Sequence, residues 1–464
     1  MGMKAMRKDR FFRPVFILLP LAALIATSEH VAAQSDPKAA AASTTQATFT
    51  KDVAPIFQRS CQTCHRPDSF APMSLLTYED ARPWAKAIKE NVVKRNMPPW
   101  HIDRNVGISE FANSVALADD EIATIVNWVD GGAPKGNPAD MPPARQFSVD
   151  DKWSIGTPDL VVQWAKDVVV PAKSPDIWTN IPVDLRMTED RYVKAVEVKA
   201  IKGLKALHHS GATAMYPEGG QAYLQSYGIG NNGHEFEKDS GIIIKAGTKV
   251  NFSAHLHAYG QETPVNAAIA FKFYPKGYVP THVALTEMMG DDAELDLPPN
   301  SDNVRTDTYR TFMKPTRLLS FQPHMHTRGK AMCVEAIYPG GGTRPGSRVE
   351  TLSCVSNYKF NWMINYEYAS DVQPLLPAGT VLHFIGWHDN SSNNRANNDP
   401  DNWIGYGQRT IDDMSHAWIT YYTLSDEEFK KAAAERKVLE QTKAKAKGKS
   451  LSARRDVPAQ RTDD

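Results

Sequence analysis

Near the beginning of the chain, two cysteines and a histidine have the spacing of a covalent haem attachment site. Cys61 and Cys64 are separated by Gln62 and Thr63, and His65 follows directly. In this C-x-x-C-H pattern the two thiols bond to the haem and the histidine binds its iron. A redox dithiol or half of a zinc site would use the same cysteines, but a zinc site lacks a second ligand pair nearby. The sequence therefore predicts one covalent haem c.

The sixth ligand of the haem iron has to come from another part of the chain. Met97 lies in the proline-rich stretch Asn96-Met97-Pro98-Pro99-Trp100. A thioether ligand raises the reduction potential of the iron, which suits electron transfer. We predict Met97 as this ligand, with Met73 as the main alternative and His101 as a weaker one.

Three histidine pairs form a second group of residues that could bind metal. Side chains two positions apart in a strand project from the same face, so a His-x-His pair can chelate one ion. Adjacent histidines point apart unless the strand ends or twists. Imidazole ligands without thiolates suit copper or zinc, and an added thioether favours copper. The pairs are His208-His209, His255-Leu256-His257 and His324-Met325-His326.

In combination, these motifs resemble a known family. LHHSGA, FSAHLHAYG, QPHMHTRGK and Asp412-Asp413-Met414-Ser415-His416 occur in the order found in the type II copper, ascorbate-dependent monooxygenases. These are the relatives of the peptidylglycine α-hydroxylating and dopamine β-hydroxylating enzymes. The chain looks more similar still to the bacterial form with a fused N-terminal cytochrome c domain. The stretches behind that closer resemblance are Ala71–Leu75, Met97–Trp100 and the asparagine-rich 389–394.

The resemblance, which extends to about residue 424, implies two copper sites per chain. His208, His209 and His255 would form an electron-transferring site, with His257 as the alternative to His255. The site that binds and activates dioxygen would consist of His324, His326 and Met414.

The same resemblance implies an enzyme, a monooxygenase that inserts one oxygen atom into a C–H bond. Its partners would be dioxygen, a small organic substrate in the cleft between two copper domains, and an external electron donor. That donor would be an ascorbate-like reductant or a periplasmic redox protein, and the haem would deliver electrons singly.

Two positions depart from the peptide-amidating members of the family. Those members carry Arg two residues before the first histidine of the dioxygen site and Tyr four residues after its methionine. This chain has Gln322 and Trp418 there, which argues against a peptide C-terminus as substrate. His416 is a candidate for contact with a copper ligand. We expect structural or solvent-exposed roles for His383 and His388.

Two other functions use the same residues. One is a non-catalytic periplasmic copper-binding electron-transfer protein, and the other is a zinc hydrolase. The thioether separates the copper functions from the zinc hydrolase, and substrate-stimulated oxygen uptake separates the enzyme from the electron carrier.

The elements expected to position these residues give a multidomain fold class. We predict a small all-α cytochrome c domain followed by two antiparallel β-sandwich, jelly-roll-like domains that bind copper. The predicted boundaries are 1–33 signal peptide, 34–46 linker, 47–135 cytochrome c domain, 150–300 and 301–425 copper-binding sandwiches, and 426–464 charged helix and disordered tail.

Composition and the first residues indicate an exported globular protein. Lys plus Arg and Asp plus Glu both total 53 among 464 residues, so no net charge favours nucleic acid. A basic start, the apolar 15–27 and Val31-Ala32-Ala33 form a secretory signal, with an uncleaved anchor as the alternative. We expect a periplasmic or secreted protein without a membrane span after cleavage.

Cys333 and Cys354 lie almost symmetrically about the turn-rich segment Pro339–Gly346. A hairpin would place them opposite each other, which favours a disulfide in an oxidising compartment. Two buried free thiols are the alternative.

Overall fold

The computed structural model describes residues 46–455, except 68, 70, 148–152, 232, 291–293 and 341–347. The predicted signal peptide, nearly all of the predicted linker and the end of the tail lie outside the described residues. No helix in the described part of the chain is long and apolar enough to cross a bilayer.

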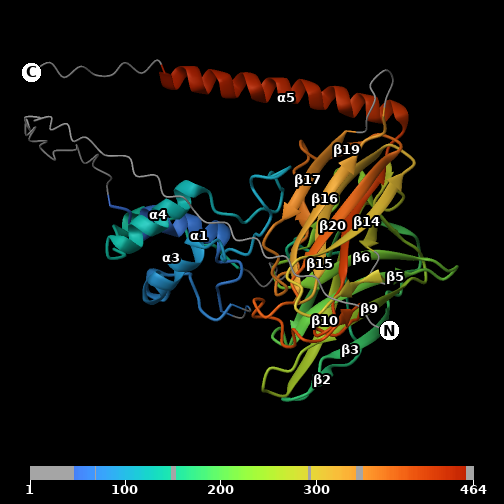
Figure 1. Ribbon diagram of the computed structural model, residues 1–464, viewed down its shortest axis with the longest axis horizontal. Helices are drawn as coiled ribbons and strands as arrows, with labels where there is room; N and C mark the ends of the chain where they lie inside the picture. The colour runs from blue at the N-terminus through green and yellow to red at the C-terminus, as the bar shows by residue number, and fades with distance from the viewer. Residues whose placement is uncertain are drawn as a thin grey trace, which may run out of the picture. The chain divides into compact units, whose positions relative to one another are not determined.

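The first described segment contains short helices (Figure 1), which pack around an aromatic core. The α-helix α4 starts with three acidic residues, which suit the positive end of a helix, and it buries Ile125 and Trp128. Phe49, Phe57 and Trp128 pack edge-on or tilted with ring centroids 5.9–6.4 Å apart. The helices are α1 (Ala54–Ser60), α2 (Tyr78–Ala81), α3 (Ala85–Val93) and α4 (Asp119–Asp130), with a π-helical turn at Phe49–Val53 and 3-10 turns at Arg82–Trp84 and Pro138–Asp140.

Two sheets enclose the first large hydrophobic cluster, in which Phe252 and Phe271 are fully buried. The larger sheet has the order β1-β10-β4-β8-β11, with β2 on β10 and β7 on β4; the smaller has the order β3-β9-β5-β6. Their strands are β1 (Leu160–Gln163), β2 (Val168–Val170), β3 (Ile177–Asp184), β4 (Arg191–Lys202), β5 (Leu207–Met215), β6 (Gln221–Gly228), β7 (His234–Glu235), β8 (Ser240–Ile244), β9 (Lys249–Leu256), β10 (Thr263–Phe273) and β11 (His282–Val283).

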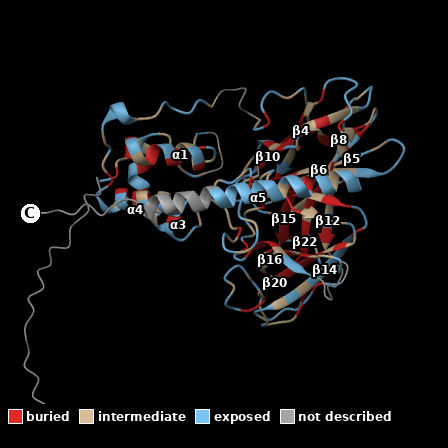
Figure 2. Ribbon diagram, turned by 90° about the horizontal axis from the view of Figure 1, so that it is seen from above, coloured by how far each residue is buried: buried red, intermediate tan, exposed pale blue. Residues whose placement is uncertain are grey.

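A second pair of sheets encloses a separate cluster around Phe321 and Leu382. One has the order β12-β22-β15-β18 with β19 on β15, the other β14-β20-β16-β17, and β13 pairs with β21. Burial is concentrated on the inner faces of these sheets (Figure 2). The strands are β12 (Leu285–Gly290), β13 (Asp296–Leu297), β14 (Val304–Phe312), β15 (Thr316–Met325), β16 (Gly329–Ile337), β17 (Val349–Val355), β18 (Tyr366–Glu367), β19 (Leu375–Leu376), β20 (Thr380–His388), β21 (Ile404–Gly405) and β22 (Ser415–Thr423).

The predicted disulfide is present between neighbouring strands of the second pair of sheets. Cys333 on β16 and Cys354 on β17 are register partners, and their sulfurs are bonded. The last helix, α5 (Asp426–Arg455), begins where Ser425 and Glu428 cap each other's backbone N–H groups.

The predicted fold class is wrong, because the described residues form no sizeable all-α cytochrome c domain. The chain is mainly β-sheet, with 38% strand and 17% helix, and the helices of residues 47–135 are short. The loop after Met97 belongs with the sheets instead: the backbone N–H groups of Asp103 and Ile108 donate to Cys354 and Leu352 on β17, at 2.7 Å each. More of this segment lies in loops and turns than in its short helices.

Candidate metal centre

Three histidines converge from two neighbouring strands of the sheet β3-β9-β5-β6. His209 on β5 is the register partner of His255 on β9. The register between these strands shifts between Leu207 and His209. Because such an irregularity adds a residue to one strand, adjacent histidines there can turn to the same side. His208, His209 and His255 are called the first histidine group below.

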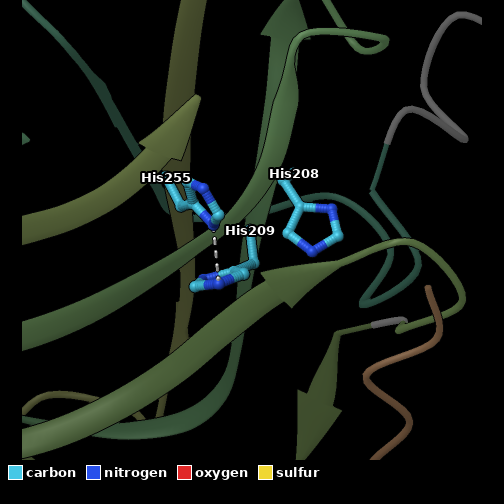
Figure 3. A group of neighbouring side chains, drawn as sticks. All are labelled: His208, His209 and His255. Carbon is cyan, nitrogen blue, oxygen red and sulfur yellow. Dashed lines mark hydrogen bonds between the residues drawn. The ribbon is translucent and has the colours of Figure 1, made fainter. Parts of the chain in front are cut away.

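The rings of the first histidine group face one another (Figure 3). One ring nitrogen of each lies within 4.8 Å of the other two. His255 Nδ1 is 3.3 Å from His209 Nε2, and His208 Nε2 is buried without a hydrogen-bond partner. His255 Nε2 also lacks a hydrogen-bond partner. Three imidazoles with neighbouring nitrogens, two of them unsatisfied, fit a copper or zinc ion.

The structure separates His255 from its alternative, His257. His255 is buried inside the group, whereas the His257 side chain is 60% exposed and donates from Nδ1 to Asp176 Oδ1 at 2.8 Å. The other oxygen of Asp176 lies 3.0 Å from His255 Nε2. His257 therefore lies outside the first histidine group, and Asp176 contacts both His255 and His257.

His324 and His326, called the second histidine group below, lie at the end of β15. Both are buried, their ring centroids are 5.3 Å apart, and His324 stacks on His416 of β22 at 4.7 Å. His324 Nδ1 and His326 Nε2 have no hydrogen-bond partner. Buried polar atoms are seldom left unsatisfied, so these nitrogens are suited to a metal.

A fully buried carboxylate positions the second histidine group relative to Met414. Asp413 accepts hydrogen bonds from the backbone N–H groups of His326 (2.8 Å), Arg328 (3.0 Å) and Met414 (2.8 Å). The Met325–Ser415 register pair places Met414, which is buried, across from His326. His326 Nδ1 also donates to the carbonyl of Asp412 at 3.1 Å, which leaves Nε2 for a metal.

The two histidine groups are neighbours. The rings of His209 and His324 are 5.8 Å apart. Phe360 contacts one member of each group, His208 at 4.8 Å and His326 at 5.6 Å between ring centroids. Metals bound by the two groups would therefore share one buried region.

The positions that depart from the peptide-amidating members lie between the two pairs of sheets. Gln322 Nε2 donates to Ser226 Oγ at 2.9 Å, and Trp418 stacks on Tyr223 at 5.6 Å. The cavity that these four residues help to line measures about 20 Å³. That volume accommodates a water but no organic substrate.

Burial shifts the pKa of the candidate ligands in the direction that metal binding needs. Burial lowers the pKa of His208 to about 4, and it holds the pKa values of His209 and His324 well below their usual range. All three imidazoles are therefore neutral at pH 7. Neutral imidazole is the form that binds metal.

The C-x-x-C-H motif forms a turn at the end of α1. The backbone N–H of His65 donates to Cys61 O at 2.9 Å, and His65 Nδ1 is 3.2 Å from Met73 O. Because Nδ1 donates to that carbonyl, Nε2 is the nitrogen available for iron. Burial raises the pKa of Cys61 to about 12 and that of Cys64 to about 11, which disfavours a reactive thiolate pair.

The alternatives for the sixth haem ligand lie in two different places. The backbone carbonyl of Met73 bonds to His65 Nδ1, so Met73 lies on the side of the His65 ring away from Nε2. Met97, by contrast, lines a cavity of about 610 Å³ together with Trp100 and His101. The lining of that cavity includes none of Cys61, Cys64 and His65, so the choice of Met97 over Met73 and His101 stays a prediction.

Several residues that organise the site were not predicted. Asp413 lies within a quoted motif, and its position before Met414 was the available signal. Asp176, Trp178 and Phe360 had no spacing pattern to mark them, because they reach the histidines only through strand pairing and loop packing.

Comparisons with known proteins identify no family. No family model and no curated protein matches the chain. Among solved structures, the major capsid protein P2 of bacteriophage PM2 shares 9% identity at a TM-score of 0.27, over 57% of this chain and 98% of that one. The T13 IBDV viral particle shares 8% identity at a TM-score of 0.17, over 58% of this chain and 75% of that one. A putative secreted protein from Parabacteroides distasonis shares 8% identity at a TM-score of 0.15, over 60% of this chain and 96% of that one. At such TM-scores these likenesses carry no argument about function.

Proposed function

We propose that the protein is an exported copper-dependent monooxygenase. It hydroxylates a C–H bond of a small organic substrate with dioxygen, and its electrons arrive through its own haem c. The observation that carries this proposal is the convergence of His208, His209 and His255, with the second histidine group beside them. The motif resemblance supports the same assignment.

The residues divide the work between two copper ions. Bound copper supplies one-electron transfer at the first histidine group and dioxygen activation at the second. His208, His209 and His255 offer imidazole nitrogens only. His324 and His326, with the thioether of Met414, give a softer ligand set that favours the reduced metal. Burial of both groups keeps bulk water away from the metals.

The haem proposal rests on the local geometry of the attachment motif. Cys61 and Cys64 are free thiols, and His65 has the orientation of an iron-binding histidine. The haem would therefore attach to the turn that follows the short helix α1. Cys333–Cys354 supports an oxidising compartment, such as the periplasm, in which haem c is attached.

The test is metal analysis combined with oxygen uptake on the full-length, haem-loaded protein. We expect two coppers and one haem per chain, and oxygen consumption with a reductant that a substrate stimulates. Purified protein that binds zinc but no copper would contradict the proposal.

A non-catalytic copper electron-transfer protein is the second candidate. The observation that favours it is the cavity of about 20 Å³ beside Gln322 and Trp418, which has no room for an organic substrate. Two coppers with reversible reduction, but without oxygen uptake across a panel of substrates, would support this candidate.

The haem has its own test. Haem bonded to Cys61 and Cys64 should remain with the polypeptide after acid-acetone extraction, and extraction into the solvent would exclude covalent attachment. Met97→Ala should remove the thioether-to-iron absorption band. Met73→Ala is the matched control and should retain it.

A further inference from the structure

Asp176 contacts both histidines of the His-x-His motif on β9. It directly precedes β3, and β3 pairs with β9 so that Ile177 faces Leu256 and Trp178 faces His255. The Asp176 side chain is 16% exposed. One carboxylate oxygen accepts from His257 Nδ1 at 2.8 Å, and the other lies 3.0 Å from His255 Nε2.

The 3.0 Å contact with His255 lacks hydrogen-bond geometry, because His255 Nε2 has no hydrogen-bond partner, so it acts through charge and proximity. With Nε2 on the carboxylate side, Nδ1 is directed toward His209 Nε2 at 3.3 Å. Trp178 stacks on the same imidazole, with ring centroids 4.2 Å apart and planes 14° apart. The ring is thus fixed by a carboxylate at one nitrogen and an indole on one face.

The same carboxylate reaches the segment that carries Met414. Thr410 Oγ1 donates to Asp176 Oδ2. Thr410 lies between β21 and β22, two residues before Asp412, whose carbonyl accepts from His326 Nδ1 at 3.1 Å. Asp176 therefore contacts His255 of the first histidine group and, through the Thr410 hydrogen bond, the segment that holds His326 of the second.

We propose that Asp176 is the positioning residue of the first histidine group. Its carboxylate lies against Nε2 of His255, which leaves Nδ1 for the copper, and its hydrogen bond from Thr410 connects it to the segment that precedes Met414. Metal-binding histidines generally donate their other ring N–H to such a partner, and its removal typically lowers metal affinity 10- to 100-fold. This inference rests on the proposed function, because it assigns copper to the first histidine group.

The experiment isolates the first histidine group in the full-length protein. His324→Ala removes one ligand of the second group, so Cu(II) added alone reports on His208, His209 and His255. We expect Asp176→Asn in this background to weaken Cu(II) binding about 10- to 100-fold in competition with a chelator. The EPR parameters of the bound Cu(II) should also change, which a merely structural contact would not cause.

The matched control is His257→Gln, which removes the exposed imidazole bonded to the same carboxylate. It should leave the Cu(II) affinity and the EPR spectrum of the His324→Ala protein unchanged. Unchanged affinity and spectrum in Asp176→Asn overturn the inference, as does an equal loss in His257→Gln. If Asp176→Asn does not fold, Asp176→Glu keeps the charge but displaces the oxygens, and its EPR spectrum should differ.

Failure of the proposed function gives a different result. In that case the His324→Ala protein, with Asp176 and all three histidines of the first group intact, binds no Cu(II). Binding in that protein with an Asp176→Asn variant that behaves identically overturns only the role of Asp176.

Discussion

The first histidine group is oriented through side chains, whereas the second is oriented mainly through the backbone. Asp176 and Trp178 contact the imidazole of His255 itself. In the second group, Asp413 binds the backbone N–H groups of His326 and Met414. A side-chain contact affects the orientation of one imidazole ring, whereas the Asp413 contacts position the backbone of two candidate ligands, His326 and Met414. The two groups should therefore respond differently to substitution.

Removal of the Asp413 carboxylate should have the largest effect. Asp413→Ala leaves three buried N–H groups without an acceptor, so we expect a loss of roughly 3–5 kcal/mol in the free energy of unfolding. Copper at the second histidine group should be lost as well. Denaturant unfolding and copper analysis measure both effects.

Asp412→Ala is the control for that substitution. Its carboxylate pairs with the exposed Arg409, an ion pair that water screens and that contributes little to stability. If both variants lose equal stability, Asp413 does not hold the second group in the way that its hydrogen bonds indicate.

Met414→Ala should remove copper from the second histidine group and spare the first. The loss of the soft ligand weakens the reduced metal, so copper per chain should fall from two toward one and oxygen uptake should stop. Met288→Ala, at an exposed methionine, should keep both coppers. His209→Ala gives the mirror test, with second-group copper retained and turnover blocked. Two coppers and full activity in Met414→Ala would make the methionine a packing residue only.

Loss of the disulfide should affect stability without affecting copper. The Cys333→Ala, Cys354→Ala double variant opens a loop of 21 residues, which costs about 3 kcal/mol in the chain-entropy model. The bond joins β16 to β17, and neither strand carries a candidate copper ligand. Thermal unfolding with copper analysis checks this prediction, and reduction of the unmodified protein should reproduce it. Loss of copper would show that the strands carrying the disulfide position the second group.

The sequence predicted local groupings of residues better than the arrangement of the whole site. Strand alternation placed His324 and His326 together, and the turn between Cys333 and Cys354 predicted their bond, because both patterns are local. The contact between His209 and His324 depends on how two pairs of sheets pack, for which the sequence has no periodic pattern. The prediction of an all-α domain failed for a related reason. Local patterns in residues 47–135 do not indicate that the loop after Met97 bonds to β17.

Phe360 and Trp178 provide the smallest and most discriminating test of the comparison. Phe360 contacts His208 and His326, one from each group, whereas Trp178 contacts only His209 and His255. Loss of one aromatic contact costs about 0.5–1.5 kcal/mol, so neither Phe360→Leu nor Trp178→Phe should unfold the protein. Phe360→Leu should alter the EPR signals of both coppers, and Trp178→Phe only that of the first group. Identical changes in the two variants would mean that the groups behave as one coupled site, and the distinction between side-chain and backbone orientation would then have no consequence for the metals.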